Sequence, residues 1–178
     1  MTLRRLSGDA LQAERWRERL GAQAAETQVL LILGGTATAA VPGISAAGAT
    51  PASRLLTAAA DAELLLLGPA GRRPHALPPL PAGVSPALIA RVVVEQLGLQ
   101  PLVVDAGAAV APAVPHLHLG AEPARCLSSG RAMPPERVEQ LLALGRRWGE
   151  QLVRLGRPVL LAECVPGGTS TAQAVLQG

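Results

Sequence analysis

Short apolar runs alternate with helical patterns along this chain. The run from Gln28 to Gly34 is wholly apolar after its first residue, which is typical of a strand buried on both faces of a sheet. Comparable runs occupy Ala62 to Gly68, Pro101 to Gly107 and Pro158 to Glu163. Because strands that alternate with helices usually lie parallel, the order predicts an α/β protein with a parallel sheet.

Helical patterns separate these runs at Pro51 to Ala60, Ser85 to Leu97 and Pro134 to Gly156. The second pattern carries its own boundaries, because Ser85 is a good N-cap, a proline follows it, and Gly98 ends it. The residues expected to face inward from this helix are Ile89, Val92, Val93 and Leu97. The third pattern carries one apolar stripe, formed by Val138, Leu141, Leu142, Gly145, Trp148, Gly149 and Leu152.

The N-terminal segment has a different character. From Asp9 to about Ala25, apolar residues recur at helical spacing with charges between them, which indicates an amphipathic helix. The sequence therefore predicts a helical segment over residues 1–27 and an α/β portion over residues 28–178. The N-terminus lacks the apolar stretch of a signal peptide, and no later apolar run reaches membrane-spanning length.

Composition excludes several classes of function. The formal charge is +3 over 178 residues, 49% of the residues are hydrophobic, and lysine is absent. A Walker-type phosphate loop needs a lysine, and the two tryptophans are too few for a platform that stacks nucleic-acid bases. No nucleic-acid or membrane partner is expected. The two cysteines suit a reducing cytoplasm rather than a disulfide framework.

The segment from Glu163 to Thr171 is the strongest candidate for a ligand site. An acid ends an apolar run there, and two glycines, Gly167 and Gly168, precede three hydroxyl residues. Glycines let an anion approach the backbone, and the hydroxyls accompany the free N–H groups of a helix start. The segment is either such an anion site or a tight turn with a good cap. The three hydroxyl residues are Thr169, Ser170 and Thr171.

Other loops leave the carboxyl ends of the predicted strands, where parallel sheets bind ligands. The loop from Val41 to Pro51 is either a flexible connector or a wall that closes on a flat organic ligand, with Ser45 as a hydrogen-bonding group. Asp105 either caps a turn or contacts a ligand. The loop from Arg125 to Arg131 either recognises phosphate or carboxylate, or is simply solvated. We expect the loops after Gly34, Val104 and Glu163 to converge.

Metal binding and thiol chemistry receive little support. His116 and His118 would share one face of a strand, but two ligands without an obvious third do not form a zinc site. Cys164 is expected to be a small buried residue rather than a nucleophile.

Several motifs, taken in order, resemble the nicotinate-nucleotide:dimethylbenzimidazole phosphoribosyltransferase family, and in particular its archaeal and cyanobacterial homologues. They are PGISAAGATP (Pro42 to Pro51), ADAE (Ala60 to Glu63), LPPLPAG (Leu77 to Gly83), VDAG (Val104 to Gly107), PARCLSSGRAM (Pro123 to Met133) and AECVPGGTSTAQAVL (Ala162 to Leu176). In the founding enzymes the last motif reads Gly-Glu-Met-Gly-Ile-Gly-Asn-Thr-Thr. Glu163, Gly168, Ser170 and Thr171 match it, whereas Ala162, Val165 and Thr169 differ.

The resemblance implies a Rossmann-like sheet with helices on both faces. It also implies transfer of phosphoribose from nicotinate mononucleotide to a benzimidazole-type base during synthesis of the lower ligand of cobamides, without a metal or cofactor. By this resemblance Ser45 and Glu163 border the base pocket, and Gly167 to Thr171 hold the phosphate.

Family members are about twice as long, and their catalytic glutamate lies beyond the segment that matches this chain. The sequence therefore predicts the N-terminal half of such an enzyme, inactive alone. The alternative is a non-catalytic protein that binds a nucleotide or base. Either would be a homo-oligomer or would pair with a complementing C-terminal fragment, because a half sheet leaves an unpaired edge.

Overall fold

One parallel sheet lies at the centre of the protein. The computed structural model describes residues 5–77 and 85–177. Within these ranges four strands pair in the order β3-β2-β1-β4, all parallel. The strands are β1 (Gln28–Leu33), β2 (Leu102–Asp105), β3 (His116–His118) and β4 (Val159–Cys164). The predicted α/β class and Rossmann-like arrangement are confirmed.

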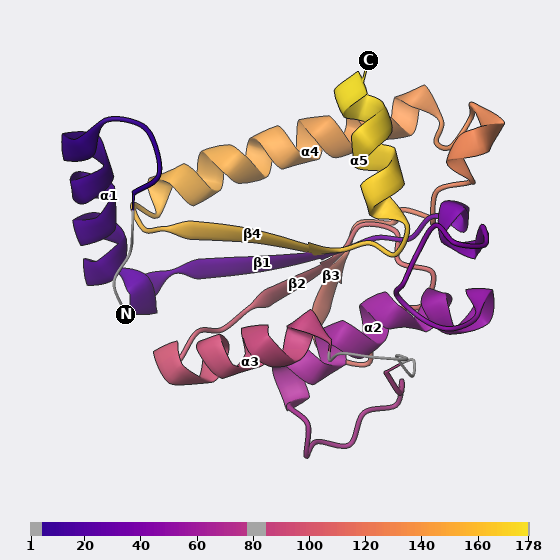
Figure 1. The fold of residues 1–178 in the computed structure, drawn as a ribbon, viewed down its shortest axis with the longest axis horizontal. Coiled ribbons are helices and arrows are strands. Elements are labelled where there is room, and N and C mark those ends of the chain that lie inside the picture. Colours follow the sequence, from indigo (N-terminus) through magenta and orange to yellow (C-terminus); the bar gives the residue numbers. More distant parts are fainter. Residues whose placement is uncertain (1–4, 78–84, 178) are drawn as a thin grey trace.

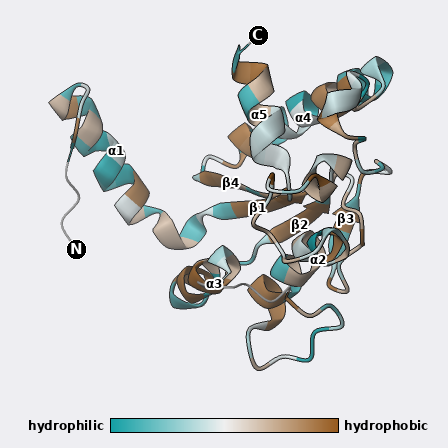
Figure 2. Ribbon diagram, turned by 45° about the vertical axis from the view of Figure 1, so that its right-hand side comes forward, coloured by the Kyte–Doolittle hydropathy of each residue, from teal (hydrophilic) through white to brown (hydrophobic). Residues whose placement is uncertain are grey.

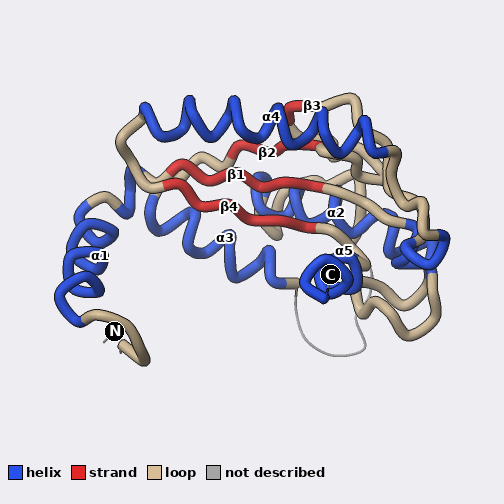
Figure 3. The backbone as a smooth tube through the Cα atoms, turned by 90° about the horizontal axis from the view of Figure 1, so that it is seen from above, coloured by secondary structure: helices blue, strands red, loops and turns tan. Residues whose placement is uncertain are grey.

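Helices lie on both faces of this sheet (Figure 1). α2 (Pro51–Leu67) and α3 (Pro86–Leu97) lie on one side, and α4 (Pro135–Arg154) and α5 (Gly168–Gln177) lie on the other. α1 (Ala10–Ala22) stands at the amino ends of the strands, away from α5. Figure 3 shows α5 end-on, beside the carboxyl end of β4. The described ranges also contain three 3-10 turns, at η1 (Ala24–Glu26), η2 (Ala37–Ala40) and η3 (Leu127–Ser129).

The core lies between the sheet and α2. Leu31 of β1 is in register with Val103 of β2 and Ala162 of β4, and Leu33 is in register with Asp105 and Cys164. Because side chains alternate between the two faces of a strand, these residues share the face that α2 covers. Hydrophobic residues gather along the strands in Figure 2. The buried core cluster consists of Leu31, Leu33, Ala58, Ala62, Leu65, Val94, Val103 and Val114.

The strand predicted over Ala62 to Gly68 is wrong, because these residues continue helix α2 as far as Leu67. A short apolar run is compatible with either a buried strand or a buried helix. Here the helix begins with a capping box between Thr50 and Ser53, and the alanines and leucines that follow are strong helix formers. The Gly68 N–H donates to Leu64 O at 2.9 Å and ends the helix.

Two further details differ from the sequence prediction. The segment Ala106 to Met133 carries little helix or strand pattern in the sequence, yet it contains strand β3, whose three residues are too few for a recognisable period. Helix α3 has the predicted N-cap and glycine stop, but the residues expected inside are exposed, Ile89 by 65%. The buried residue of α3 is Val94, because the helix is apolar over more than one face and packs on α2 through a different one.

Helices α1 and α4 contribute no fully buried residue. Asp9 caps α1 by accepting a hydrogen bond from Gln12 N at 2.7 Å, as the predicted helix start requires. None of the helices in the described ranges combines the length and the apolar character needed to cross a bilayer. The motif from Leu77 to Gly83 lies, apart from Leu77, outside the described residues, and the division into residues 1–27 and 28–178 stays a prediction.

Candidate functional site

The loops at the carboxyl ends of the strands meet, as the sequence predicted. The Gly34 N–H, after β1, donates to Cys164 O at 3.2 Å, and the Ala106 N–H, after β2, donates to Leu33 O at 2.8 Å. The turn after β4 also approaches the loop after β1 closely, because a Cβ on Gly167 would lie 2.8 Å from Ala39 N. Only glycine fits at such a distance, so Gly167 allows this contact.

Helix α2 holds the loop from Val41 to Pro51 in place. The buried Arg54 donates from Nε to Gly48 O at 2.8 Å and from Nη1 to Ala39 O at 2.7 Å. The Thr57 hydroxyl donates to Ala47 O at 2.6 Å. The loop is therefore anchored at two of its own carbonyls and, through Ala39, at the 3-10 turn that precedes it, which supports the wall interpretation over that of a flexible connector. Ser45 Oγ accepts from Ala47 N at 3.2 Å, and its hydroxyl donates to no other residue in the described part of the chain, so this proton can serve a ligand.

A cavity of about 840 Å³ opens between this loop, α2, α3 and β4. Most of its lining is apolar, and this part includes Leu31, Leu65, Leu88, Val94 and Leu160. Ser45, Glu163, Gly167 and Thr169 also line it, so the structure brings together four of the eight predicted site residues. Asp105, Gly168, Ser170 and Thr171 are not part of the lining. Such a cavity suits a flat, largely apolar ligand with a few polar groups.

The glycine turn leads directly into α5. Gly168 N donates to Val165 O at 2.8 Å, which closes the turn, and Gly167 has a φ of 79°. Thr169 is exposed in the first turn of α5, where the backbone N–H groups of a helix start lack partners within the helix. Together with the helix dipole, these groups favour an anion at this place.

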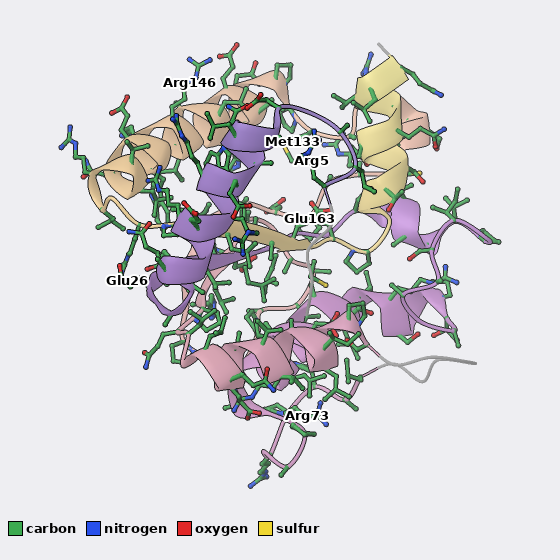
Figure 4. All side chains as sticks on the ribbon, turned by 60° about the vertical axis from the view of Figure 1, so that its left-hand side comes forward. Arg5, Glu26, Arg73, Met133, Arg146 and Glu163 are labelled. Atoms are coloured by element: carbon green, nitrogen blue, oxygen red, sulfur yellow. The ribbon has the colours of Figure 1, made fainter. Side chains whose placement is uncertain are left out.

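Glu163 is exposed near the end of β4, where it is in register with Ile32 of β1. Figure 4 shows it near the end of this strand, while Met133 and Arg146 lie by α4. These last two residues belong to a separate apolar hollow of about 530 Å³ on α4. None of the residues that line that hollow also lines the cavity of about 840 Å³, so it is not part of the candidate site.

Asp105 caps a turn, which is one of the two roles that the sequence left open. Its Oδ1 accepts from the N–H groups of Gly107 at 3.0 Å and Ala108 at 2.8 Å. Its Oδ2 lies 2.8 Å from His118 Nδ1. Burial alone would raise the pKa of Asp105, but the bonds from Ala108, His118 and Gly107 lower it below its usual value. With both oxygens engaged in this way, Asp105 stabilises the loop after β2.

The loop from Arg125 to Arg131 is tied to the end of β1. Thr36 Oγ1 donates to Arg125 O at 3.2 Å, and Leu127 N donates to Thr38 Oγ1 at 2.9 Å. Arg125 N donates to Ala132 O at 2.8 Å, which closes the loop on itself. Arg125 and Arg131 are both exposed. Exposed side chains can be solvated or can contact a ligand, so both roles stay open for these two arginines.

Asp61 is a site residue that the sequence did not predict. Asp61 belongs to α2 and lines the cavity. Ser85 Oγ donates to its Oδ1 at 2.6 Å, and Cys164 Sγ donates to its Oδ2 at 3.4 Å. Burial raises the pKa of the Asp61 carboxyl, and the two hydrogen bonds oppose this effect. The signal available in the sequence was a carboxylate within a run of alanines and leucines.

Cys164 is partly buried, as expected of a structural residue. Burial raises the pKa of the Cys164 thiol far above its usual range, and the nearby Asp61 carboxylate raises it further. The thiol is therefore protonated at neutral pH and acts as a donor, not as a nucleophile.

No metal-binding cluster forms among residues 5–77 and 85–177, since no three His, Cys, Asp or Glu side chains gather there suitably. His116 Nδ1 lies 2.8 Å from Val114 O, and His118 pairs with Asp105. A cation does line the cavity, because Arg73 contributes to its wall. Its Nε and Nη1 atoms are buried and have no hydrogen-bond partner in the described part of the chain.

Comparisons with known proteins relate the chain to one group. No family model matches it. The UPF0284 protein of Parasynechococcus marenigrum is 60% identical over 152 residues, which are 84% of this chain and 38% of that protein. The UPF0284 protein of Microcystis aeruginosa is 50% identical over 148 residues, 83% of this chain and 41% of that protein.

The UPF0284 protein of Synechocystis is 45% identical over 169 residues, 94% of this chain and 45% of that protein. The chain is therefore similar to one part of the UPF0284 proteins, and it spans less than half the length of these curated relatives.

Proposed function

We propose that this chain forms the nucleotide-binding part of a phosphoribosyltransferase that acts on nicotinate mononucleotide and a benzimidazole-type base. The observation that carries the proposal is the cavity of about 840 Å³, where Ser45, Glu163, Gly167 and Thr169 lie on an otherwise largely apolar wall. Three of these residues come from the motif that resembles the phosphate and base motif of that family. The cavity combines room for a flat base with an anion-binding helix start.

In the proposed complex the nucleotide phosphate lies against the first turn of α5. Gly167 keeps the backbone accessible, and Thr169 to Thr171 add hydroxyl donors. The helix dipole favours the negative charge of the phosphate. No lysine is needed in this arrangement, which fits a chain that has none.

The apolar part of the cavity would exclude water around the reacting atoms. In the transfer, a ring nitrogen of the base attacks the anomeric carbon of the nucleotide, and the bond from that carbon to nicotinate breaks. The proton of the ring N–H passes to a carboxylate. Fixed dipoles in a dry cavity stabilise the positive charge that develops on the ribose. In the family that this chain resembles, the carboxylate is a glutamate beyond the matching segment.

Calorimetric titration with nicotinate mononucleotide tests the phosphate position. A Thr169→Asp change places a negative charge where the phosphate would lie, while an acid in the first turn favours the helix itself. We expect the dissociation constant to rise at least about tenfold, which corresponds to roughly 1.4 kcal/mol. Gly168 is a poorer choice for this test, because a Cβ there would lie 2.9 Å from Val165 Cβ and would distort the turn.

Gln173→Glu is the matched control, since it adds the same charge one turn further along the exposed surface of α5. It should leave the affinity within about twofold of the original value. Equal affinities in the Thr169→Asp variant and the original chain would contradict a phosphate at this turn. Binding of the nucleotide without any turnover, even with the remaining part of a UPF0284 relative supplied, would favour the non-catalytic alternative.

We also propose that another polypeptide covers β4, either a second copy of this chain or a complementing C-terminal fragment. β4 is at the edge of the sheet among the described strands. Leu160 and Leu161 are 53% and 66% exposed, so both faces of an apolar strand are open. Proteins normally cover such edges.

A further inference from the structure

Asp61 is a carboxylate in an otherwise largely apolar cavity wall. We infer that Asp61 determines the specificity for the base by accepting a hydrogen bond from its ring N–H when the base binds, before that proton leaves in the transfer step, an inference that rests on the proposed function. The ligand class is a planar heteroaromatic ring that carries at least one N–H donor.

Three separate elements position the Asp61 carboxylate. Asp61 comes from α2, Ser85 is the N-cap of α3, and Cys164 is the last residue of β4. The Ser85 hydroxyl donates to Oδ1 at 2.6 Å, and the Cys164 thiol donates to Oδ2 at 3.4 Å. All three residues line the same cavity. The carboxylate is therefore oriented by its neighbours at the place where α2, α3 and the sheet meet.

This carboxylate retains capacity for a further donor. A carboxylate accepts about four hydrogen bonds, and the described side chains of Ser85 and Cys164 supply two, of which the thiol is a weak donor. Within the described ranges Asp61 forms no ion pair. A partly buried charge without a cationic partner is costly unless it is hydrogen-bonded. A ligand N–H would supply the missing donor.

Glu63, two residues further along the same helix, shows what a purely structural carboxylate looks like in this protein. It is fully buried, and it accepts bonds from two backbone N–H groups, those of His75 and Ala113. The His75 ring lies 2.6 Å from its Oε1. Glu63 does not line the cavity, whereas Asp61 does. The two carboxylates differ in both access and hydrogen-bond saturation, so Asp61 is the one available to a ligand.

The experiment compares benzimidazole with 1-methylbenzimidazole, which has the same ring but no N–H. Titration calorimetry of the full chain should show benzimidazole binding at least about tenfold more tightly. Asp61→Ala should abolish this preference, because the acceptor is gone. Asp61→Asn should reduce it to about threefold or less, because a neutral carbonyl is a weaker acceptor than a carboxylate. Glu95→Gln, which neutralises an exposed carboxylate on α3, should preserve the preference.

Each other outcome overturns the inference. A preference that persists in Asp61→Ala would show that another group accepts the hydrogen bond from the N–H. Equal affinity for the two rings in the original chain, or no affinity for either, would show that the N–H is not recognised at all. If Asp61→Ala fails to fold, the isosteric Asp61→Asn decides. Nicotinate mononucleotide is titrated in parallel, and its affinity should not change in either Asp61 variant. If the original chain does not bind the nucleotide, that result counts against the proposed function. The comparison of the two rings tests only the role of Asp61.

Discussion

The Nδ1 atom of His75 lies 2.6 Å from Oε1 of Glu63, a carboxylate with no exposed surface. The backbone N–H of His75 donates to Oε2 at 3.0 Å, and that of Ala113 donates to Oε1 at 2.9 Å. One side chain of α2 thus holds two loops that are far apart in the sequence. In the loop after β2 this contact adds to the hydrogen bonds that Asp105 accepts from Gly107 and Ala108.

Glu63→Gln should therefore destabilise the protein markedly. The amide keeps the shape but loses the charge, and its NH₂ group would face donors, so about 2–4 kcal/mol of unfolding free energy should be lost. Urea denaturation followed by circular dichroism measures the change. The exposed Glu95→Gln serves as control and should cost less than about 0.5 kcal/mol. A loss of similar size in both variants would contradict the clamp role of Glu63.

The pH dependence of stability should separate Glu63 from Asp61. Burial would raise the pKa of Glu63, but the bonds from Ala113 and His75 lower it overall. Its contribution is therefore full above the unfolded pKa of about 4, and it is lost as the pH falls through the lower folded pKa. The destabilisation by Glu63→Gln should shrink as the pH falls from 7 to about 3.

Asp61 has the opposite sign, because burial raises its pKa. The folded chain binds this proton more tightly than the unfolded chain does. The stability that results is fully present below about pH 4 and is lost as the pH rises through the folded pKa. Asp61→Asn should therefore become more favourable for stability, relative to the original chain, as the pH rises from 3 to 7. Parallel pH slopes for Asp61→Asn and Glu63→Gln would refute this assignment.

Two glycine substitutions should change stability in opposite directions. Gly107 has a φ of 116°, and a Cβ there would lie 2.7 Å from Glu122 O. Gly107→Ala should cost at least about 2 kcal/mol because both strain and the clash oppose it. Gly145→Ala in α4 meets no atom within 4 Å and should stabilise by about 0.5–1 kcal/mol. Thermal unfolding checks both values, and a stable Gly107→Ala variant would be inconsistent with this geometry.

The exposed strand β4 should cause self-association. Leu161 is 66% exposed on this edge strand, so a second copy can pair with it or cover it. Leu161→Lys should lower the association constant measured by sedimentation velocity, because a charge would be buried at the contact. Val175→Lys on α5, where the original side chain is 76% exposed, is the control and should have a smaller effect. A chain that is monomeric at every concentration would disprove self-association through β4.

Local patterns were sufficient where a segment carried its own boundaries. The strands β1 and β4 and the N-cap and stop of α3 agree with prediction because apolar runs, Ser85 and Gly98 act over a few neighbouring residues. The second half of α2 was misassigned because AELLLL suits a buried helix as well as a buried strand. The inward face of α3 was misassigned because its partner surface, and not its own period, selects Val94.

For the candidate site, the sequence by itself determined the chemistry at the end of β4. The glycines and hydroxyls from Gly167 to Thr171 follow an apolar strand, and that order predicts either an anion site or a well-capped tight turn at a helix start. Only the tertiary structure decided which other side chains share the cavity. It placed Asp61 beside Ser85 and Cys164, and it committed Asp105 and Glu63 to loops. These contacts join residues up to 103 positions apart, and such pairings depend on how helices pack on the sheet, which no local pattern records.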